Sequence, residues 1–313
     1  NEATFIVDAV VASSSNLVVS ELHYRPAAPT PAEEDAGFLE RSVFEFIEVM
    51  NIGLNEVDMT NVRFTDGVEF NFDSSLQGIT LAPGQRFILV SSIDAFQIRY
   101  PGVSSSLIAG EFSGSLSNGG EQITLQASDN SVVRGFTYDD KSPWPESPDG
   151  DGFSLTLINP GGDPDHADPF SWRASVTIGG SPTGSDASSF SGNALDDLDG
   201  DGLEALIEYL LGTSDTVPSG AAGPTVAAQN LLVDTVADDY FTMTVVLDLS
   251  ADDVEYQVEI SDDLAVWESG SGHVEHVSST NNGDGTLTVV YRSADPIGAG
   301  IHEYFRLRVI SRS

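Results

Sequence analysis

The sequence predicts an all-β fold built from two β-sandwich domains, and three observations lead to this expectation. Short runs rich in β-branched and aromatic residues recur along the chain and are separated by Gly, Pro, Asn and Asp, as in strands joined by turns. Only one segment, residues 203–211, has the apolar spacing of a helix. The length of 313 residues allows two or more domains, and a stretch rich in Gly and Ser at 179–195 is expected to be a flexible linker between them.

Residues 1–16 precede the first domain and contain a strongly β-type run at 4–12. We expect an extra strand there. It either lengthens the first sandwich or pairs with the open sheet edge of a neighbouring subunit. The second arrangement would insert Phe5, Val7 and Ala9 into another subunit, and such a contact propagates as a head-to-tail fibre.

An ordered set of sequence features spans residues 17–178. The set comprises the runs 17–26, 44–51, 81–90, 116–121 and 149–155, together with Trp144-Pro145 and Ser171-Trp172. In this order and spacing the features resemble the lamin-tail domain, an immunoglobulin-like β-sandwich that also occurs in secreted bacterial proteins. The resemblance implies a scaffold or binding module without a catalytic centre. The alternation of apolar and polar residues at 44–49 supports a sandwich independently of the family.

Two groups of polar residues in this domain could instead form a catalytic or metal-binding site. Glu21, His23, Glu45 and Glu48 could form an acid/base or metal cluster, but we expect them to make local hydrogen bonds between strands. The acidic loop 163–168, which includes His166, is a second metal candidate beside its simpler interpretation as a solvated loop.

Residues 197–208 have the spacing of a calcium-binding loop, which is the most specific motif in the chain. Such a loop needs oxygen ligands at positions 1, 3 and 5, a glycine at 6, a backbone carbonyl at 7 and a bidentate glutamate at 12. Position 9 is Ala205, so a water would complete the shell. The predicted Ca²⁺ ligands are Asp197, Asp199, Asp201, the carbonyl of Leu203, and Glu208. The alternative is an acidic, glycine-rich turn that caps a helix.

Only the exit side of this loop is predicted to be helical, and Gly212 is expected to end that helix. Residues 196–215 therefore resemble the half-hand loops of dockerin-like and thrombospondin-type-3-like modules. That resemblance implies a structural calcium ion. We expect a clamp between the domains, not a switch.

Residues 216–313 are predicted to form a second sandwich, also immunoglobulin-like. Its expected strands are 240–249, 254–260, 286–291 and 303–309, some with clear alternation of apolar and charged residues. The run 261–267 and the closing run 304–309 resemble terminal modules of acidic secreted bacterial proteins, for which no firm activity is known. Trp267 is expected in the sandwich core, with a sugar-stacking platform as the alternative.

Composition limits the partners and the medium. The net charge is −37, from 49 acidic and 12 basic residues, which excludes a phosphate-backbone partner such as nucleic acid. Such self-repulsion is tolerated where salt screens it, so we expect a salty, calcium-containing medium. There are no cysteines and no run long enough to insert into a membrane. We expect a mature secreted or cell-surface protein, or a piece of one.

Two hypotheses of function follow. The first is a non-catalytic, calcium-stabilised extracellular structural or adhesive protein, whose partner is either itself, as a homopolymer, or a cell-surface or extracellular polymer. The second is a glycan-binding accessory module of a larger secreted hydrolase. The sequence contains no arrangement of residues that nominates an enzyme.

Overall fold

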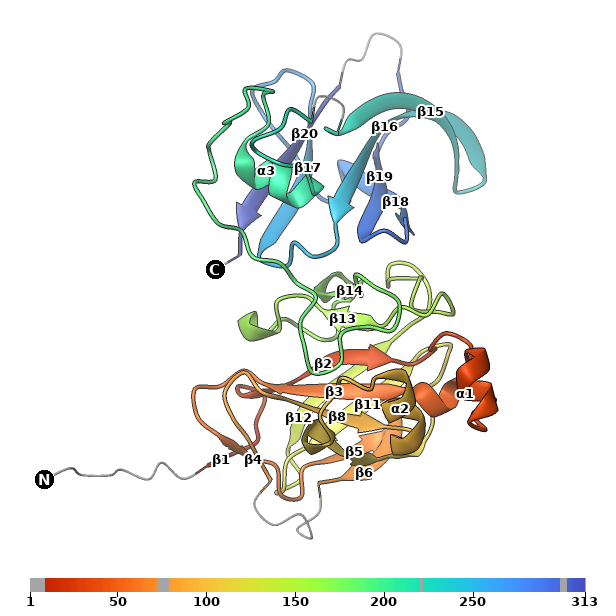
Figure 1. Cartoon of the computed structure of the whole chain (residues 1–313). Coiled ribbons are helices and arrows are strands. Elements are labelled where there is room, and N and C mark those ends of the chain that lie inside the picture. Colours follow the sequence, from red (N-terminus) through yellow and green to blue (C-terminus); the bar gives the residue numbers. More distant parts are fainter. Residues whose placement is uncertain (1–8, 73–78, 220–221, 299–302, 313) are drawn as a thin grey trace, which may run out of the picture. The chain divides into compact units, whose positions relative to one another are not determined.

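The computed structural model describes residues 9–72, 79–219, 222–298 and 303–312, and it confirms the all-β expectation (Figure 1). The chain forms two compact units, Asn1–Asp186 and Ala187–Ser313. The boundary falls inside the stretch 179–195 that composition marks as a linker. Among the described residues, no helix is long and apolar enough to cross a membrane.

Two main sheets form the sandwich of the first unit. In order across the sheet, the six-stranded sheet contains β14 (Trp172–Ala174), β13 (Leu155–Leu157), β2 (Leu17–His23), β3 (Phe46–Asn51), β8 (Arg86–Val90) and β9 (Ile108–Glu111). The five-stranded sheet contains β10 (Ser113–Gly114), β6 (Val68–Asn71), β5 (Arg63–Asp66), β11 (Glu121–Gln126) and β12 (Val132–Tyr138). Apolar side chains from both sheets, such as Leu22, Val49, Ile123 and Phe136, join in one buried cluster. The sheets therefore pack face to face, as in a sandwich.

The strands β2 and β3 are buried almost throughout, on both faces of the sheet. On the face away from the main core, Phe46 and Ile88 pack with Phe96 of α2 (Ile93–Arg99) in a second apolar cluster. The remaining elements of this unit are α1 (Pro31–Asp35), the small sheet of β1 (Val10–Val11), β4 (Val57–Asp58) and β7 (Thr80–Leu81), and 3₁₀ turns at Arg41–Phe44, Ser105–Leu107, Pro160–Gly162 and Pro169–Ser171. Burial on both faces explains why polar residues of β2 and β3 also become buried.

The predicted N-terminal strand lies partly outside the described residues, which begin at residue 9. The described part forms β1, which pairs in parallel with β4 of the same chain through Val10 opposite Val57. This end of the segment therefore extends the first unit, while the pairing of residues 4–8 stays a prediction.

The second unit is a smaller sandwich, and its described residues include one helix. Its four-stranded sheet has the order β15 (Thr225–Val233), β16 (Val236–Asp248), β19 (Thr286–Ser293) and β18 (Val274–Asn281). A two-stranded sheet pairs β17 (Val254–Ser261) with β20 (Tyr304–Ser311). Val245 and Leu247 of the larger sheet pack with Val254 of the smaller one and with Leu206 and Leu210 of α3 (Ala205–Leu211). The segment 197–211 thus contributes its helix to the core of this unit.

Candidate metal centre

The loop 197–202 is folded by its own aspartates. Asp197 accepts hydrogen bonds from the backbone N–H groups of Gly200 and Gly202, at 2.9 and 3.2 Å. Gly200 and Gly202 have φ of +74° and +96°, which favour glycine over residues that carry a Cβ. Asp199 accepts from the N–H of Asp201 at 3.0 Å. The spacing of Asp and Gly therefore forms a tight turn that directs carboxylates toward a common centre.

Three carboxylates meet in this turn. Asp197, Asp199 and Asp201 each offer an oxygen, and these oxygens all lie within 4.8 Å of one another. Oxygens bound to one calcium ion at 2.3–2.6 Å can be at most about 5 Å apart, so the three are close enough to share an ion. It is the only such cluster of His, Asp or Glu found in the described part of the chain.

Glu208 is placed beside this cluster by α3. The helix begins after Glu204 and ends at Gly212, whose φ of +69° and N–H bond to Tyr209 form the C-terminal cap. Glu208 is 1 % exposed although helical spacing predicts that it points away from the apolar stripe. Its Oε1 accepts a hydrogen bond from Thr213 at 3.0 Å. Glu208 is not one of the three residues whose oxygens group within 4.8 Å, but the charges of two of them, Asp199 and Asp201, act on its carboxylate.

The electrostatics of the site favour a cation. Burial raises the pKa of Glu208, Thr213 lowers it through its hydrogen bond, and the charges of Asp199, Asp201 and Asp215 raise it. Asp199 Oδ2 and Glu208 Oε2 are both buried and have no hydrogen-bond partner among the described residues. Buried polar atoms are almost always partnered, so these two oxygens fit the role of metal ligands. The set consists of oxygens alone, which suits a hard cation such as Ca²⁺.

Two further residues support the loop, and sequence spacing did not identify them. Asp215 accepts a hydrogen bond from the N–H of Leu198 at 3.0 Å. Ser219 donates its N–H and its hydroxyl to Asp201 Oδ2, at 2.7 and 2.8 Å. Both residues follow α3, and no fixed offset in the motif marks them. The chain must fold back past the helix before they reach the loop.

The carboxylates Glu21 and Glu48 form a buried pair across β2 and β3, where they lie opposite each other. Ser20 and Ser154 donate to them, and Arg86 lies 2.9 Å from Glu48. Burial raises the pKa of both carboxyls, and the charge of Glu21 raises that of Glu48 further. The pair is held inside the unit by hydrogen bonds and one ion pair, as expected for structural residues.

Residues 179–186 cover this carboxylate pair. The N–H of Ser181 donates to Glu21 at 3.0 Å, and the N–H of Thr183 donates to Glu48 at 2.7 Å. Asp186 pairs with Arg173 at 2.6 Å and accepts from the N–H of Val176. The flexible segment expected from composition is therefore bonded to the first unit over these residues, and we refer to 179–186 as the strap.

The other polar candidates are also structural. His23 contacts the carbonyl of Gly152 at 3.2 Å, and burial lowers its pKa to about 3. Glu45 accepts from the N–H of Leu116 at 2.8 Å, and burial raises its pKa to about 7. Both side chains are directed into the unit and serve as partners of backbone groups.

The acidic loop 163–168 does not gather its side chains. Asp163 pairs with Arg134, while Asp165 and Asp168 accept from nearby backbone N–H groups. His166 is buried beside Trp172, with ring centres 5.6 Å apart, and burial lowers its pKa to about 4. The expectation of a solvated loop holds for the aspartates but not for the histidine.

The tryptophans differ in exposure. Trp144 and Trp172 belong to the core of the first unit. Trp267 is half-buried and lies outside both apolar clusters of the second unit, with the Arg306 guanidinium 4.3 Å from its ring centre. The expectation that Trp267 fills the sandwich core is therefore wrong, because its loop lies beside the edge of β17, where Glu268 bridges to Ile260.

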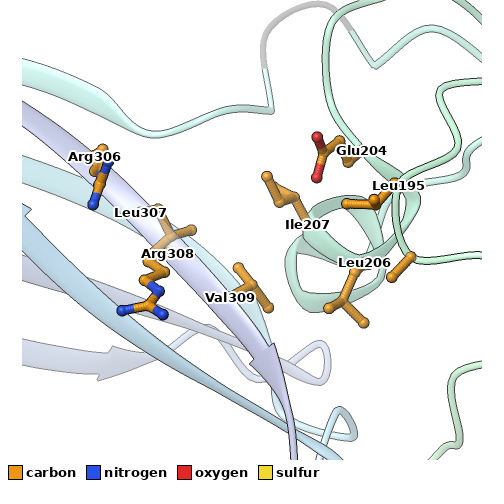
Figure 2. Close-up of a pocket in the computed structure, with 9 residues that line it drawn as sticks. Leu195, Glu204, Leu206, Ile207, Arg306, Leu307, Arg308 and Val309 are labelled. Atoms are coloured by element: carbon orange, nitrogen blue, oxygen red, sulfur yellow. The ribbon is translucent and has the colours of Figure 1, made fainter.

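One groove of about 320 Å³ lies between α3 and β20 of the second unit. Figure 2 shows Leu206 and Ile207 of the helix facing Leu307 and Val309 of the strand, with Glu204 and Arg306 nearby. None of its lining residues is aromatic, so the groove itself offers no platform for stacking a sugar.

Comparisons with known proteins identify the first unit alone. Residues 11–140 match the family model of the Lamin Tail Domain. No curated protein and no solved structure matched the chain. The lamin tail domain is an immunoglobulin-like binding or structural domain that is not known to be catalytic. Strands β13 and β14 follow residue 140, yet β13 pairs with β2 of the matched region, so the unit extends beyond the match. The N-terminal unit of this chain contains a lamin tail domain.

Proposed function

We propose that this chain is a non-catalytic, extracellular structural or adhesive protein whose second unit is stabilised by one calcium ion. The observation that carries the proposal is the convergence of three aspartate oxygens beside the buried Glu208. The proposed ligands are Asp197, Asp199, Asp201, the carbonyl of Leu203 and both oxygens of Glu208.

Charge explains why an ion would stabilise this loop. Asp197, Asp199 and Asp201 repel one another, and the buried Glu208 adds to the repulsion when it is ionised. A divalent cation offsets this repulsion and gives the unpartnered oxygens of Asp199 and Glu208 a ligand. Because α3 packs in the core of the second unit, ordering the loop would stabilise the whole unit.

A structural role suits this ion better than a signalling role. A sensor site opens a pair of helices around its loop, but residues 187–196, directly before Asp197, form turns and irregular backbone and not a helix. Extracellular calcium modules bind with Kd of about 10⁻⁴ to 10⁻³ M, which matches millimolar calcium outside cells. The net charge of −37 also favours a salty medium, where the Debye length falls below about 8 Å.

The hydrogen bonds of the buried carboxylates in the first unit are consistent with a scaffold. The titratable residues of the first unit, including Glu21, Glu45 and Glu48, serve as hydrogen-bond partners inside the fold. We propose that the partner is a second copy of the chain or an extracellular polymer. Strand addition by residues 4–12 is the proposed route to a fibre, with β1 as its anchor on the first unit.

Trp267 supports a second candidate, a glycan-binding module. Its ring is half-buried outside the core, and Arg306 lies over the ring. If a sugar stacks there, Trp267→Ala should abolish retention of the protein on a glycan array without lowering its melting temperature. Equal retention of both proteins would refute this candidate.

The calcium proposal is tested by thermal unfolding of the full chain in 10 mM CaCl₂ and in EDTA. At 10 to 100 times Kd the ion should stabilise the second unit by about 1.4–2.7 kcal/mol, and the melting temperature should rise by about 5–10 °C. Glu208→Gln should remove this rise. Glu204→Gln, at the exposed carboxylate one turn earlier, is the matched control and should retain it. Identical unfolding curves in calcium and EDTA would refute the proposal.

A further inference from the structure

The strands β15 and β16 form a hairpin whose outer half is not covered by the rest of the second unit. Residues 225–239 are exposed almost throughout, and none of them belongs to either apolar cluster of this unit. Figure 1 shows them as a long curved ribbon that ends in a tight turn. At the base of the arm Ile297 donates its N–H to the carbonyl of Asp239 at 2.7 Å, but no described strand pairs with β15 on its outer side. A two-stranded ribbon with both faces in water is only marginally stable, so a further strand on β15 would secure the arm.

The outer strand of the arm is an unprotected sheet edge. β15 is the first strand of its sheet and has β16 as its strand partner among the described residues. It is nine residues long, and it contains no Pro and no charged residue. Proteins usually guard such edges with charge, Pro or a bulge, and a long apolar edge without these features is a pairing site. Val226 and Leu232 are 51 % and 74 % exposed.

The net charge of the chain and the absence of charge on β15 indicate what kind of partner can pair with this sheet edge. Two copies of a chain with a net charge of −37 repel each other, so they can approach closely only where a surface carries no charge. The nine residues of β15 are such a surface, in a protein in which 19 % of residues are charged. The strand is also self-complementary, because residues 226–228 and 231–233 are apolar and its centre, Gln229-Asn230, is neutral and polar.

We propose that β15 pairs antiparallel with β15 of a second copy across a two-fold axis at Gln229. The two four-stranded sheets then become one continuous sheet in the dimer. This inference goes beyond the proposed function, since it requires neither bound calcium nor the N-terminal strand. The contact is isologous, so it closes as a dimer.

The turn of the hairpin fixes which backbone groups are free for this pairing. Asp234 and Thr235 have φ of +47° and +72°, as in a two-residue primed turn, and Val233 lies opposite Val236. Hydrogen-bonded pairs alternate from that point, so the even-numbered residues of β15 direct their N–H and C=O groups outward. In the two-fold register Ala228 meets Asn230 and Val226 meets Leu232 of the second copy. All four of these residues are even-numbered, so their outward N–H and C=O groups can form hydrogen bonds between the two strands.

The same register places Gln229 opposite its own copy in a non-hydrogen-bonded pair, where Cα atoms lie about 4.5 Å apart. That distance is within the range of about 4.4–6.8 Å that a disulfide spans. Because the chain has no cysteine, Gln229→Cys introduces a single thiol per molecule. In a glutathione redox buffer with 1 M NaCl, this variant should form a disulfide-linked dimer.

Asp238→Cys is the matched control for this cross-link. Asp238 is exposed on the same arm, opposite Leu231, but it lies on β16, one strand further from the axis. It should stay monomeric under the same conditions. Gln229→Cys should cross-link equally in calcium and in EDTA, and also after deletion of residues 1–9. A Gln229→Cys variant that yields no more dimer than Asp238→Cys would overturn the proposal.

Sedimentation equilibrium of the unmodified chain gives an independent measurement. The chain should dimerise in high salt, and Ala228→Pro should be monomeric, because proline removes an outward N–H that β16 does not use. Leu232→Asp leaves the backbone intact and should also abolish the dimer, since it adds negative charge at the paired edge of two chains that already repel each other. Dimers that persist in both variants, or a chain that stays monomeric at all salt concentrations, would refute the pairing.

Discussion

Gly180 is the position at which we expect a single methyl group to damage the first unit most. A Cβ at Gly180 would lie 2.1 Å from Glu21 Oε1 and 2.7 Å from Ser154 Oγ, both of which are buried. The strap must therefore move away from the sheet in Gly180→Ala. The movement would separate the N–H of Ser181 from Glu21, a contact of 3.0 Å.

A matched control separates this close approach from backbone strain. Gly84 has φ of +73°, close to the +76° of Gly180, but a Cβ there would meet no atom within 4 Å. Both substitutions should cost about 1–2 kcal/mol for an L residue in the left-handed region. Burial raises the pKa of Glu21 to about 7, so at pH 8, where Glu21 is ionised, Gly180→Ala should cost about 1.5–3 kcal/mol more, the value of one hydrogen bond to a charged group.

Hydrogen exchange measures the effect where it arises. In Gly180→Ala the amide protons of Ser181 and Thr183 should exchange about 10- to 100-fold faster than in Gly84→Ala, as 1.4 kcal/mol corresponds to a factor of ten. Urea unfolding followed by the fluorescence of Trp144 and Trp172 reports the stability of the same unit. Equal exchange rates and equal urea midpoints for the two variants would show that the strap is not held by this contact.

Three other predictions concern pH, calcium and salt. Burial raises the pKa of Glu45 from 4.5 to about 7, so its contribution is fully present below pH 4.5 and is lost as pH rises through 7. Glu45→Gln should therefore remove up to about 3 kcal/mol of the loss in urea stability between pH 5 and 8, and an unchanged loss would contradict this. Asp215→Asn should weaken calcium binding about tenfold by calorimetry, because it removes charge and loosens the Leu198 contact, whereas Asp238→Asn on the remote hairpin should not. With calcium saturating, molar NaCl should raise the melting temperature by screening the net charge of −37, and a steady decrease would argue against that reasoning.

The two histidines of the first unit oppose the effect of Glu45 over part of the pH range. Burial lowers the pKa of His23 to about 3 and that of His166 to about 4, from 6.5. A lowered histidine pKa contributes stability above pH 6.5 that is lost as pH falls toward the folded value. The histidine contribution is the same in the wild type and in Glu45→Gln, so the difference between these two proteins at each pH isolates Glu45.

Local spacing in the sequence predicted several strands, and also the turn at 197–202 with the helix that follows it. Strands such as β17 and β20 follow from alternation, since successive side chains point to opposite faces of a sheet. The turn at 197–202 and the helix stop at Gly212 follow from short-range geometry, where Asp caps nearby N–H groups and Gly adopts positive φ. The lamin tail domain was also recognisable, because its features occur in a fixed order along the chain.

Only the tertiary structure determined the contacts between residues that lie far apart in the sequence. The N–H of Ser181 reaches Glu21 across 160 positions, and the composition of the strap gives no sign of that bond. Asp215 joins the loop only because the chain folds back after α3, and Trp267 leaves the core because its loop lies beside the edge of β17. Which side chains are buried, and which groups they bond to, depends on which segments meet in space. A local pattern encodes which face of an element is apolar, but not which distant segment covers that face.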